Sequence, residues 1–425
     1  MVYISIGSLL RTEWIIPIFL GMIFFASLVA NKTRIPYTMV LVVAGIIISL
    51  AHVTGFGTFG TTKFEVSPNL ILDFIVPPLI FEAMMKIDRE RFRTVRISSL
   101  LLATLGVVLA TLVGGFLLSY VAGLPTIVAF AFSALIAPTD AAIVIEIFKK
   151  IKAPESLTAL MQSEASFNDA TGLVIFSSIV ALSLAQGSAL ENPATIGQIN
   201  VDILGQSEHF VLVFFGGIAI GLGFAIAARY LMRLMNEPLP VTALSVAVLF
   251  GSVVVADALK LSGLVAAAAS GLYFGSTVMT GRGAMSETAR VYNSHFWDMI
   301  AFLANSVAFL YLGLSMDILN IGKNLPLIVM AFGAVLAARA ASTYPILAAT
   351  HRFTHEKWPN PWRHVVMIGG MRGALSVAMV ATLPDSSFKA ILETITFGVV
   401  LSSLIVQYPV LSRYMRKAFP QPKAA

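Results

Sequence analysis

One short stretch of the sequence places two carboxylates among small and apolar residues. Residues 163–172 read Ser-Glu-Ala-Ser-Phe-Asn-Asp-Ala-Thr-Gly. In a helix with about 3.6 residues per turn, Glu164 and Asn168 lie on one face, while Asp169 is rotated about 140° from Glu164. The two acids therefore meet different neighbours. One can be held in an ion pair, and the other can bind and release a proton or a cation; capping or pairing within a helix bundle is the alternative for both.

A second polar cluster follows a proline, in the sequence Ala137-Pro138-Thr139-Asp140. Within an apolar run, Pro138 removes a backbone donor and clashes with the preceding turn, which frees carbonyl oxygens in the middle of a helix. Freed carbonyls that line a cavity can ligate an ion, together with the Thr139 hydroxyl and the Asp140 carboxylate. A simple proline kink with a hydrogen-bonded Asp140 is the alternative.

A third segment surrounds a cation with glycines, in the sequence Gly369-Gly370-Met371-Arg372-Gly373. Within an apolar run, this composition predicts a break in a helix around a buried arginine. Close approach of two helices without a break would also explain the glycines.

Together these oxygen donors suit a small, hard monovalent cation, which needs no Cys or His ligand. A carboxylate also binds a proton, so H⁺ and a metal cation can compete for one site. If only one acid at the site releases its charge, one proton leaves for each cation bound, and exchange is electroneutral. The chain has no Cys. We expect transported ions here and no cofactor.

The elements that must position these residues are apolar. Of the 425 residues, 57% are hydrophobic and 12% are charged, and the mean hydropathy is +0.87. A membrane helix needs about 20 apolar residues, so the chain is predicted to be an all-α integral membrane protein with about thirteen spans. The predicted spans are 14–30, 37–53, 69–85, 98–123, 126–148, 157–185, 208–232, 238–257, 261–280, 295–318, 325–350, 364–383 and 390–412. One span fewer is the alternative, because only a short turn separates 238–257 from 261–280.

The basic residues predict the orientation of these spans. Of the 28 Lys and Arg, 21 lie in every second connection. Positively charged loops face the cytoplasm, which predicts an outside N-terminus and a cytoplasmic tail at 413–425 in a plasma membrane protein. The formal net charge of +6 then reflects topology, so no nucleic-acid partner is expected.

The two predicted breaks occupy equivalent places in two halves of the chain. They fall in the fifth span, 126–148, and the twelfth, 364–383. These spans are seven apart in order, and because this offset is odd they cross in opposite directions. Spans one to six (14–185) and eight to thirteen (238–412) then form two inverted repeats, joined by the seventh (208–232). Paired broken helices that cross at a midplane site are typical of secondary transporters.

Other classes of protein fit less well. The chain lacks His-Glu-x-x-His, Gly-x-Gly-Asp, Gly-x-Ser-x-Gly and phosphate-loop sequences, so we expect no enzyme and no intramembrane hydrolase. A sodium-coupled symporter of an organic anion would use similar repeats and stays a rival. It would need a larger polar cavity, and the sites found here are acidic.

Four motifs resemble those of the monovalent cation:proton antiporters, in particular the electroneutral sodium/proton exchanger branch. They are Pro77 to Ala83 in the third span, Thr139-Asp140 in the fifth, Glu164 with Asn168-Asp169 in the sixth, and Gly370 to Gly373 in the twelfth. The resemblance covers residues 14–412. It implies a homodimer in membrane lipids, in which a core domain with the crossed fifth and twelfth helices moves against a dimerisation domain.

The same resemblance implies the ion ligands. Asp169 would carry both the cation and the proton, and Asn168 beside it would mark the electroneutral branch. Thr139 and Asp140 would lie at the helix crossing, with Asp140 near the ion and offsetting the positive helix ends. Na⁺ would then be held by Asp169, Asp140 and Thr139, and the predicted ion-binding site would also include Asn168, Ser166 and Glu82.

The resemblance also implies roles for four charged residues. Glu164 would pair with Arg372 as a structural bridge. Glu82 would either reach the ion site or brace the cytoplasmic end near Lys86. Arg339 resembles a family arginine with a structural or regulatory role.

Two departures from the family pattern concern the choice of cation. The family commonly has a serine directly after the glutamate, whereas this chain has Ala165 followed by Ser166, which turns the hydroxyl about 100° around the helix. The proline often found after the fifth-span aspartate is Ala141 here, and Pro138 precedes the aspartate instead. The predicted activity is exchange of Na⁺ or Li⁺ for H⁺, with K⁺/H⁺ exchange as the alternative.

Overall fold

The structure is a computed structural model that describes residues 15–33, 35–53, 71–87, 89–185, 203–234, 237–279, 285–316, 318–383 and 388–419. Every regular element within these ranges is a helix, as predicted, and one large apolar core joins most of them. Residues 1–14 and residues 420–425 of the predicted tail lie outside the described residues.

The described helices follow the predicted apolar runs. In the first half they are α2 (Ile15–Thr33), α3 (Tyr37–Val53), α5 (Val76–Met85), α6 (Arg89–Leu101), α7 (Val107–Val121), α8 (Thr126–Ile136), α9 (Ala142–Ile151) and α10 (Glu155–Ala185). In the second half they are α11 (Ile203–Met232), α12 (Pro238–Ala258), α13 (Gly263–Tyr273), α14 (Glu287–Leu314), α15 (Ile318–Lys323), α16 (Leu325–Phe353), α17 (Asn360–Ile368), α18 (Ala374–Ala381), α19 (Lys389–Ser402) and α20 (Tyr408–Ala418). Among the described residues, six helical segments are long and apolar enough to cross a membrane, and four apolar helices are shorter.

Two helices begin before their apolar runs. α6 begins at Arg89, where we predicted a span from 98, and α14 begins at Glu287, where we predicted a span from 295. Arg and Glu are good helix formers, so a helix continues through charged residues that a hydropathy pattern leaves out. α14 starts at an N-cap, because the Ser286 hydroxyl accepts a hydrogen bond of 3.2 Å from the Ala289 N–H.

Wider π-helical turns lie within or at one end of several described helical segments, and the sequence pattern did not predict them. They are η1 (Ile71–Ile75), η2 (Leu102–Gly106), η4 (Phe274–Met279) and η5 (Ser403–Gln407). η1 precedes Pro77 and Pro78, and η5 precedes Pro409. A proline lacks the N–H for the preceding turn, and its ring displaces the carbonyl four residues earlier. The helix accommodates each proline by widening that turn.

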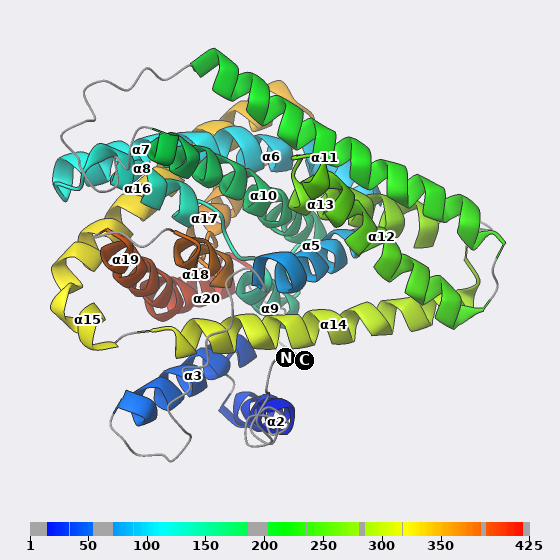
Figure 1. Cartoon of the computed structure of the whole chain (residues 1–425), viewed down its shortest axis with the longest axis horizontal. Coiled ribbons are helices and arrows are strands. Elements are labelled where there is room, and N and C mark those ends of the chain that lie inside the picture. Colours follow the sequence, from blue (N-terminus) through cyan, green and yellow to red (C-terminus); the bar gives the residue numbers. More distant parts are fainter. Residues whose placement is uncertain are drawn as a thin grey trace, which may run out of the picture.

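The helices pack in two groups (Figure 1). One group contains α2, α3, α5 and α11 to α14; the other contains α6 to α10 and α16 to α20. Figure 1 shows α11, α12 and α13 together at the right, with α14 running across below them and α2 and α3 beneath α14. Helices α17 to α20 lie on the left. The two groups meet where α10 and α18 pack against α5, α13 and α14.

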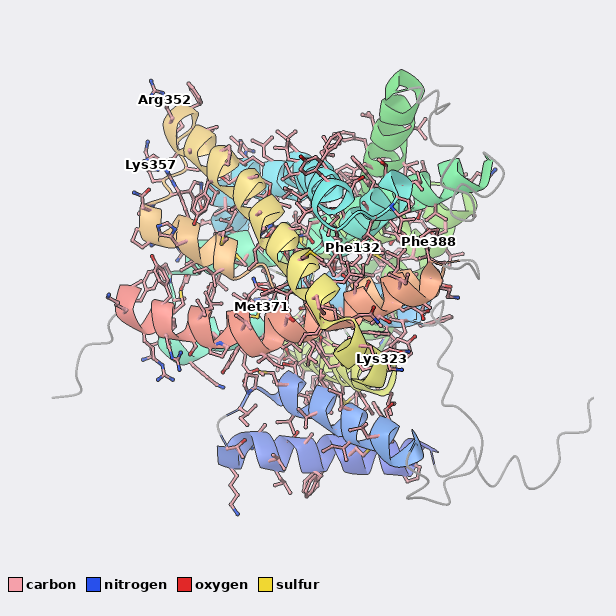
Figure 2. All side chains as sticks on the ribbon, turned by 90° about the vertical axis from the view of Figure 1, so that its left-hand side faces the viewer. Phe132, Lys323, Arg352, Lys357, Met371 and Phe388 are labelled. Atoms are coloured by element: carbon pink, nitrogen blue, oxygen red, sulfur yellow. The ribbon has the colours of Figure 1, made fainter. Side chains whose placement is uncertain are left out.

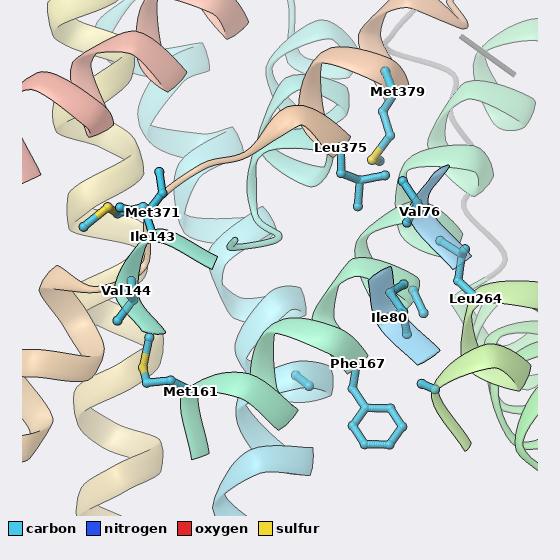
Figure 3. Packing of buried hydrophobic residues seen from close by; sticks show 14 of the residues in the cluster. Val76, Ile80, Ile143, Val144, Met161, Phe167, Leu264, Met371, Leu375 and Met379 are labelled. Atoms are coloured by element: carbon cyan, nitrogen blue, oxygen red, sulfur yellow. The ribbon is translucent and has the colours of Figure 1, made fainter. Parts of the chain in front are cut away.

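Apolar side chains line this boundary between the two groups (Figure 3). Val76 and Ile80 of α5 and Leu264 of α13 lie on one side, and Phe167 of α10 and Leu375 of α18 lie on the other. All five are buried. At these residues the two groups touch through apolar side chains, which dispersion forces hold together.

The segment between α17 and α18 lies deep in the bundle. Figure 2 shows Arg352 and Lys357 at one end of α16 and Lys323 near its other end, with Met371 between them. Met371 is fully buried. The predicted twelfth-span break is therefore far from both polar ends of the helices.

Candidate ion-binding site

Two helical breaks contact each other inside the bundle. One break, residues 137–141, separates α8 from α9, and the other, residues 369–373, separates α17 from α18. The Asp140 N–H donates a hydrogen bond of 2.8 Å to the Met371 carbonyl oxygen. This bond joins one break directly to the other.

Glycines allow the backbones at these breaks to approach closely. The Pro138 ring packs against Gly172 of α10, where a Cβ would lie 2.7 Å from the Pro138 Cδ. At Gly373 a Cβ would lie 2.6 Å from the Asp140 Cβ. Gly369 ends α17, and its N–H still bonds to the carbonyl of the preceding turn over 2.7 Å. The predicted break is therefore present, the alternative of a continuous helix is wrong, and the glycines also allow close packing at the break.

Arg372 satisfies the backbone that Pro138 disrupts. Its guanidinium Nη1 donates hydrogen bonds of 2.6 Å to the Ala137 carbonyl and 3.0 Å to the Pro138 carbonyl. Arg372 is 2% exposed. Carbonyls that a broken helix leaves without partners are costly inside a membrane, so the cation from one break stabilises the other.

Asp140 accepts a hydrogen bond from the first residue of the helix that follows its break. Its Oδ1 accepts a hydrogen bond of 2.8 Å from the Ala142 N–H, at the start of α9. A carboxylate at a helix N-terminus also offsets the positive end of the helix dipole. One oxygen of Asp140 is therefore occupied by the backbone.

Glu164 pairs with Arg339, and the predicted Glu164–Arg372 pair is wrong. Arg339 Nη1 lies 2.9 Å from Glu164 Oε1, and Arg339 Nη2 lies 3.0 Å from Oε2. Arg339 Nη2 also donates to the Val366 carbonyl of α17 over 3.3 Å. Glu164 is 0% exposed and Arg339 is 5% exposed, which makes this a buried, two-pronged ion pair.

The packing explains why Arg339 takes this place. At Gly370 a Cβ would lie 2.6 Å from the Arg339 Nε, so the glycine leaves room for that side chain. The Arg372 guanidinium is turned instead toward the Ala137 and Pro138 carbonyls. The sequence marks both arginines as buried, but only the packing of α16 against α17 decides which one meets Glu164.

Asn168 and Thr139 form a hydrogen-bonded cluster with Glu164. Asn168 Nδ2 donates to Glu164 Oε1 over 2.7 Å and to Thr139 Oγ1 over 2.9 Å. The Thr139 N–H donates to Asn168 Oδ1 over 3.3 Å, and the Thr139 hydroxyl lies 3.5 Å from Glu164 Oε1. The amide of Asn168 therefore links α10 to the break between α8 and α9.

Asp169 meets different neighbours from Glu164, as its rotation around α10 predicts. It is partly buried, whereas Glu164 and Asn168 are fully buried. Among the described residues, its carboxylate makes neither an ion pair nor a hydrogen bond. This acid is thus free to bind a proton or a cation.

Two residues predicted near the ion have other contacts. The Ser166 hydroxyl donates to the Gln162 carbonyl of its own helix over 2.9 Å. Glu82 forms an ion pair with Lys86, which also contacts Asp298 of α14. Glu82 was expected either to reach the ion site or to brace the helix end near Lys86, and the contact observed is the one with Lys86.

Sequence reasoning missed two further residues that contact the break between α17 and α18. They are Ser403 and Gln407, both in η5 of the last helical segment. Their only sequence signal is that they are polar residues within an apolar run. Nothing in a single sequence directs them toward residues 369–373.

An apolar helical bundle in which two broken helices meet beside a free acid defines the class of secondary membrane transporters. Residues 19–417 match the family described as sodium/hydrogen exchanger, transmembrane. The chain therefore belongs to the sodium/hydrogen exchanger family, and it is a transporter, not an enzyme.

Individual relatives agree with this assignment. The Na⁺/H⁺ antiporter ApNhaP of Aphanothece halophytica is 30% identical over 397 residues, which cover 92% of this chain and 71% of that protein. The Na⁺/H⁺ antiporter NhaG of Bacillus atrophaeus is 31% identical over 386 residues, covering 89% of this chain and 70% of that protein. The solved structure of the sodium proton antiporter MjNhaP1 of Methanocaldococcus jannaschii matches with a TM-score of 0.73 and 21% identity, covering 97% of this chain and 100% of that chain. The last comparison shows a shared fold.

Proposed function

We propose that this protein exchanges Na⁺ or Li⁺ for H⁺ across a membrane, one cation for one proton. The observation that carries the proposal is the free carboxylate of Asp169, beside a site whose other charged groups are already paired or hydrogen-bonded. The family assignment and the names of the relatives, which are Na⁺/H⁺ antiporters, support it.

The charges at the site support a one-to-one exchange. Glu164 and Arg339 cancel each other, and the charge of Arg372 offsets that of Asp140. The ionised Asp169 then leaves the empty site with one negative charge, which either Na⁺ or H⁺ neutralises. An unpaired charge at the bilayer centre costs about 3 kcal/mol, so the loaded site moves across the membrane more readily than the empty one.

The side chain beside Asp169 is neutral, which also supports one-to-one exchange. Asn168 adds no charge, and its amide donates to both Glu164 and Thr139. The proposed Na⁺ ligands are Asp169, the second oxygen of Asp140 and the Thr139 oxygen, with H⁺ competing for Asp169. Ser166 and Glu82 have no contact to this site among the described residues, and we leave them out of the proposed ligand set.

The two packing groups suggest how the site alternates between the two sides. We propose that the group holding α6 to α10 and α16 to α20 is the core domain, which moves against a dimerisation domain formed by the other group. The apolar boundary in Figure 3 supports this division, because sliding there breaks few directed bonds. A hydrogen bond that crosses the boundary is donated by Gln162 to the Ala83 carbonyl over 2.8 Å.

The remaining features of the proposal come from the sequence. The protein would be a homodimer with about thirteen spans in the plasma membrane, with its N-terminus outside and its C-terminus in the cytoplasm. Residues 14–185 and 238–412 would be inverted repeats, joined by 208–232.

K⁺/H⁺ exchange is a second candidate because of one contact. The Ser166 hydroxyl is bonded within its own helix, and Ala165 stands where the resemblance to the family implies a serine. A site with one oxygen ligand fewer discriminates less strongly for the small Na⁺ ion. The cation preference therefore needs a direct measurement.

The test is proton movement in proteoliposomes with an imposed pH gradient and a clamped membrane potential. Na⁺, Li⁺, K⁺ or choline is added to vesicles holding wild type, Asp169→Asn, or Asp257→Asn. Asp257 is a matched control, because it lies exposed at the end of α12, away from the site. Collapse of the gradient by Na⁺ or Li⁺ in wild type and in Asp257→Asn, and its absence in Asp169→Asn, is the expected result. A response to K⁺ alone would favour the second candidate, and no response to any cation would refute both.

A further inference from the structure

Two polar side chains of η5 contact the break between α17 and α18. The Ser403 hydroxyl accepts a hydrogen bond of 3.3 Å from the Arg372 N–H. Gln407 Nε2 donates a hydrogen bond of 3.2 Å to the Ile368 carbonyl. A broken helix leaves such backbone groups without partners in their own helix. The last helical segment therefore satisfies the backbone on both sides of Gly369 and Gly370.

The π-helical turn places both side chains toward this break. Ser403 and Gln407 begin and end η5, and Pro409 follows two residues later. Ser403 is 0% exposed and Gln407 is 5% exposed, so neither side chain can turn to water. The Ser403 hydroxyl also donates to the Val400 carbonyl over 2.7 Å, which fixes its orientation.

The backbone segment that η5 contacts is also hydrogen-bonded to the segment that carries Asp140. The Arg372 backbone N–H bonds to the Ser403 hydroxyl, and the Arg372 guanidinium donates to the carbonyls of Ala137 and Pro138. The Met371 carbonyl accepts the N–H of Asp140. A shift of residues 371 and 372 therefore moves the backbone that carries Asp140.

We propose that Ser403 and Gln407 are positioning residues of the ion site, acting through Arg372 and Met371 on Asp140. Neither residue touches the cation. They fix the backbone of the break at residues 369–373, and this break fixes the one at residues 137–141. This inference rests on the proposed cation exchange for its transport readout, but its structural readout is independent of transport.

The chain offers a matched control for the serine. Ser402 is the preceding residue, is half-buried, and its hydroxyl bonds to the Gly398 carbonyl of its own helix over 2.7 Å. The test compares Ser403→Ala and Gln407→Met with Ser402→Ala, and adds Ser403→Thr, which keeps the hydroxyl. Each variant is reconstituted, the folded protein is quantified, and the apparent Na⁺ KM and maximal rate are measured per folded transporter.

Loss of either contact leaves one buried backbone group unsatisfied and loosens Asp140. We expect Ser403→Ala and Gln407→Met each to raise the apparent Na⁺ KM about fivefold at a nearly unchanged maximal rate. Ser402→Ala and Ser403→Thr should keep the wild-type KM. A role confined to stability would lower the amount of folded protein in the first two variants and leave their KM unchanged, and that result would overturn the proposal.

A second measurement separates this proposal from the proposed function. Because the chain contains no Cys, spin labels can be placed at two introduced cysteines, for example at the exposed Asn360 of α17 and Arg416 of α20. We expect a broader distance distribution in Gln407→Met than in wild type, and an unchanged one in Ser402→Ala. If wild type moves no cation, the proposed function fails, and this distribution alone decides the inference. An unchanged distribution in Gln407→Met would refute it.

Discussion

The buried pair between Glu164 and Arg339 makes a quantitative prediction. Both side chains are almost completely buried, and two bonds of 2.9 and 3.0 Å join them. Glu164→Gln or Arg339→Gln alone should lower the free energy of unfolding by about 3–5 kcal/mol, because each leaves one charge buried without its partner. In the double variant no charge is stranded, so the loss should be clearly smaller than the sum of the two single losses.

A double-mutant cycle measures this difference as a coupling energy. For Glu164 with Arg339 we expect a coupling of about 2–3 kcal/mol, the upper range for residues in direct contact. For Glu164 with Arg372 we expect less than about 1 kcal/mol, because the Arg372 guanidinium is bonded to carbonyl oxygens and not to the glutamate.

The assay is reversible unfolding of the purified protein in mixed micelles of a mild detergent and sodium dodecyl sulfate, followed by tryptophan fluorescence. Wild type, the three single variants and the two double variants are compared in the same micelles. A coupling of Glu164 with Arg372 as large as that with Arg339 would refute our assignment of the pair. If the losses in the free energy of unfolding are additive in both cycles, neither arginine is a specific partner of Glu164.

Three further predictions concern the ion and the breaks. Lowering the pH should raise the apparent Na⁺ KM and leave the maximal rate unchanged, because we propose that H⁺ competes with Na⁺ for Asp169; a fall in maximal rate at constant KM would contradict this. Gly370→Ala should destabilise the protein by about 1–3 kcal/mol, because its Cβ would lie 2.6 Å from the Arg339 Nε. In the same unfolding assay the control Gly333→Ala, with nothing within 4 Å of its Cβ, should be neutral or stabilising, and equal losses in both would count against the packing argument. Ala165→Ser should shift selectivity toward Na⁺ over K⁺ in vesicles. An unchanged ratio of the rates with Na⁺ and K⁺ would show that this position does not set the selectivity.

The parts of the fold that local chemistry determines could be predicted from the sequence. Apolar composition requires helices in a membrane, because every backbone group must find a partner there. Pro138 removes such a partner, and the glycines at 369–373 weaken helix formation, so both segments were expected to be breaks. The different surroundings of Glu164 and Asp169 follow from their angular separation on one helix.

The partners of the buried charges could not be predicted in the same way. Arg339 and Arg372 are both arginines in apolar runs, and either could serve Glu164 by charge alone. The choice depends on the close approach of α16 to the break at Gly370, which is a property of tertiary packing. The π-helical turn before Pro409 is a similar case, because it sets the direction of Ser403 and Gln407, which hydropathy does not record.

The mutual support of the two breaks has a consequence for biogenesis. The Arg372 side chain bonds to the Ala137 carbonyl, a residue that precedes it by 235 positions in the chain. At a synthesis rate of about 5–20 residues per second, the ribosome needs on the order of ten seconds or more between these two residues. During that interval the first broken helix is already made while its partner is not, so its carbonyls need water or the insertion machinery as temporary partners. Complete folding of the transporter therefore waits for the last part of the chain, and truncation before Arg372 should leave a chain that quality control can recognise.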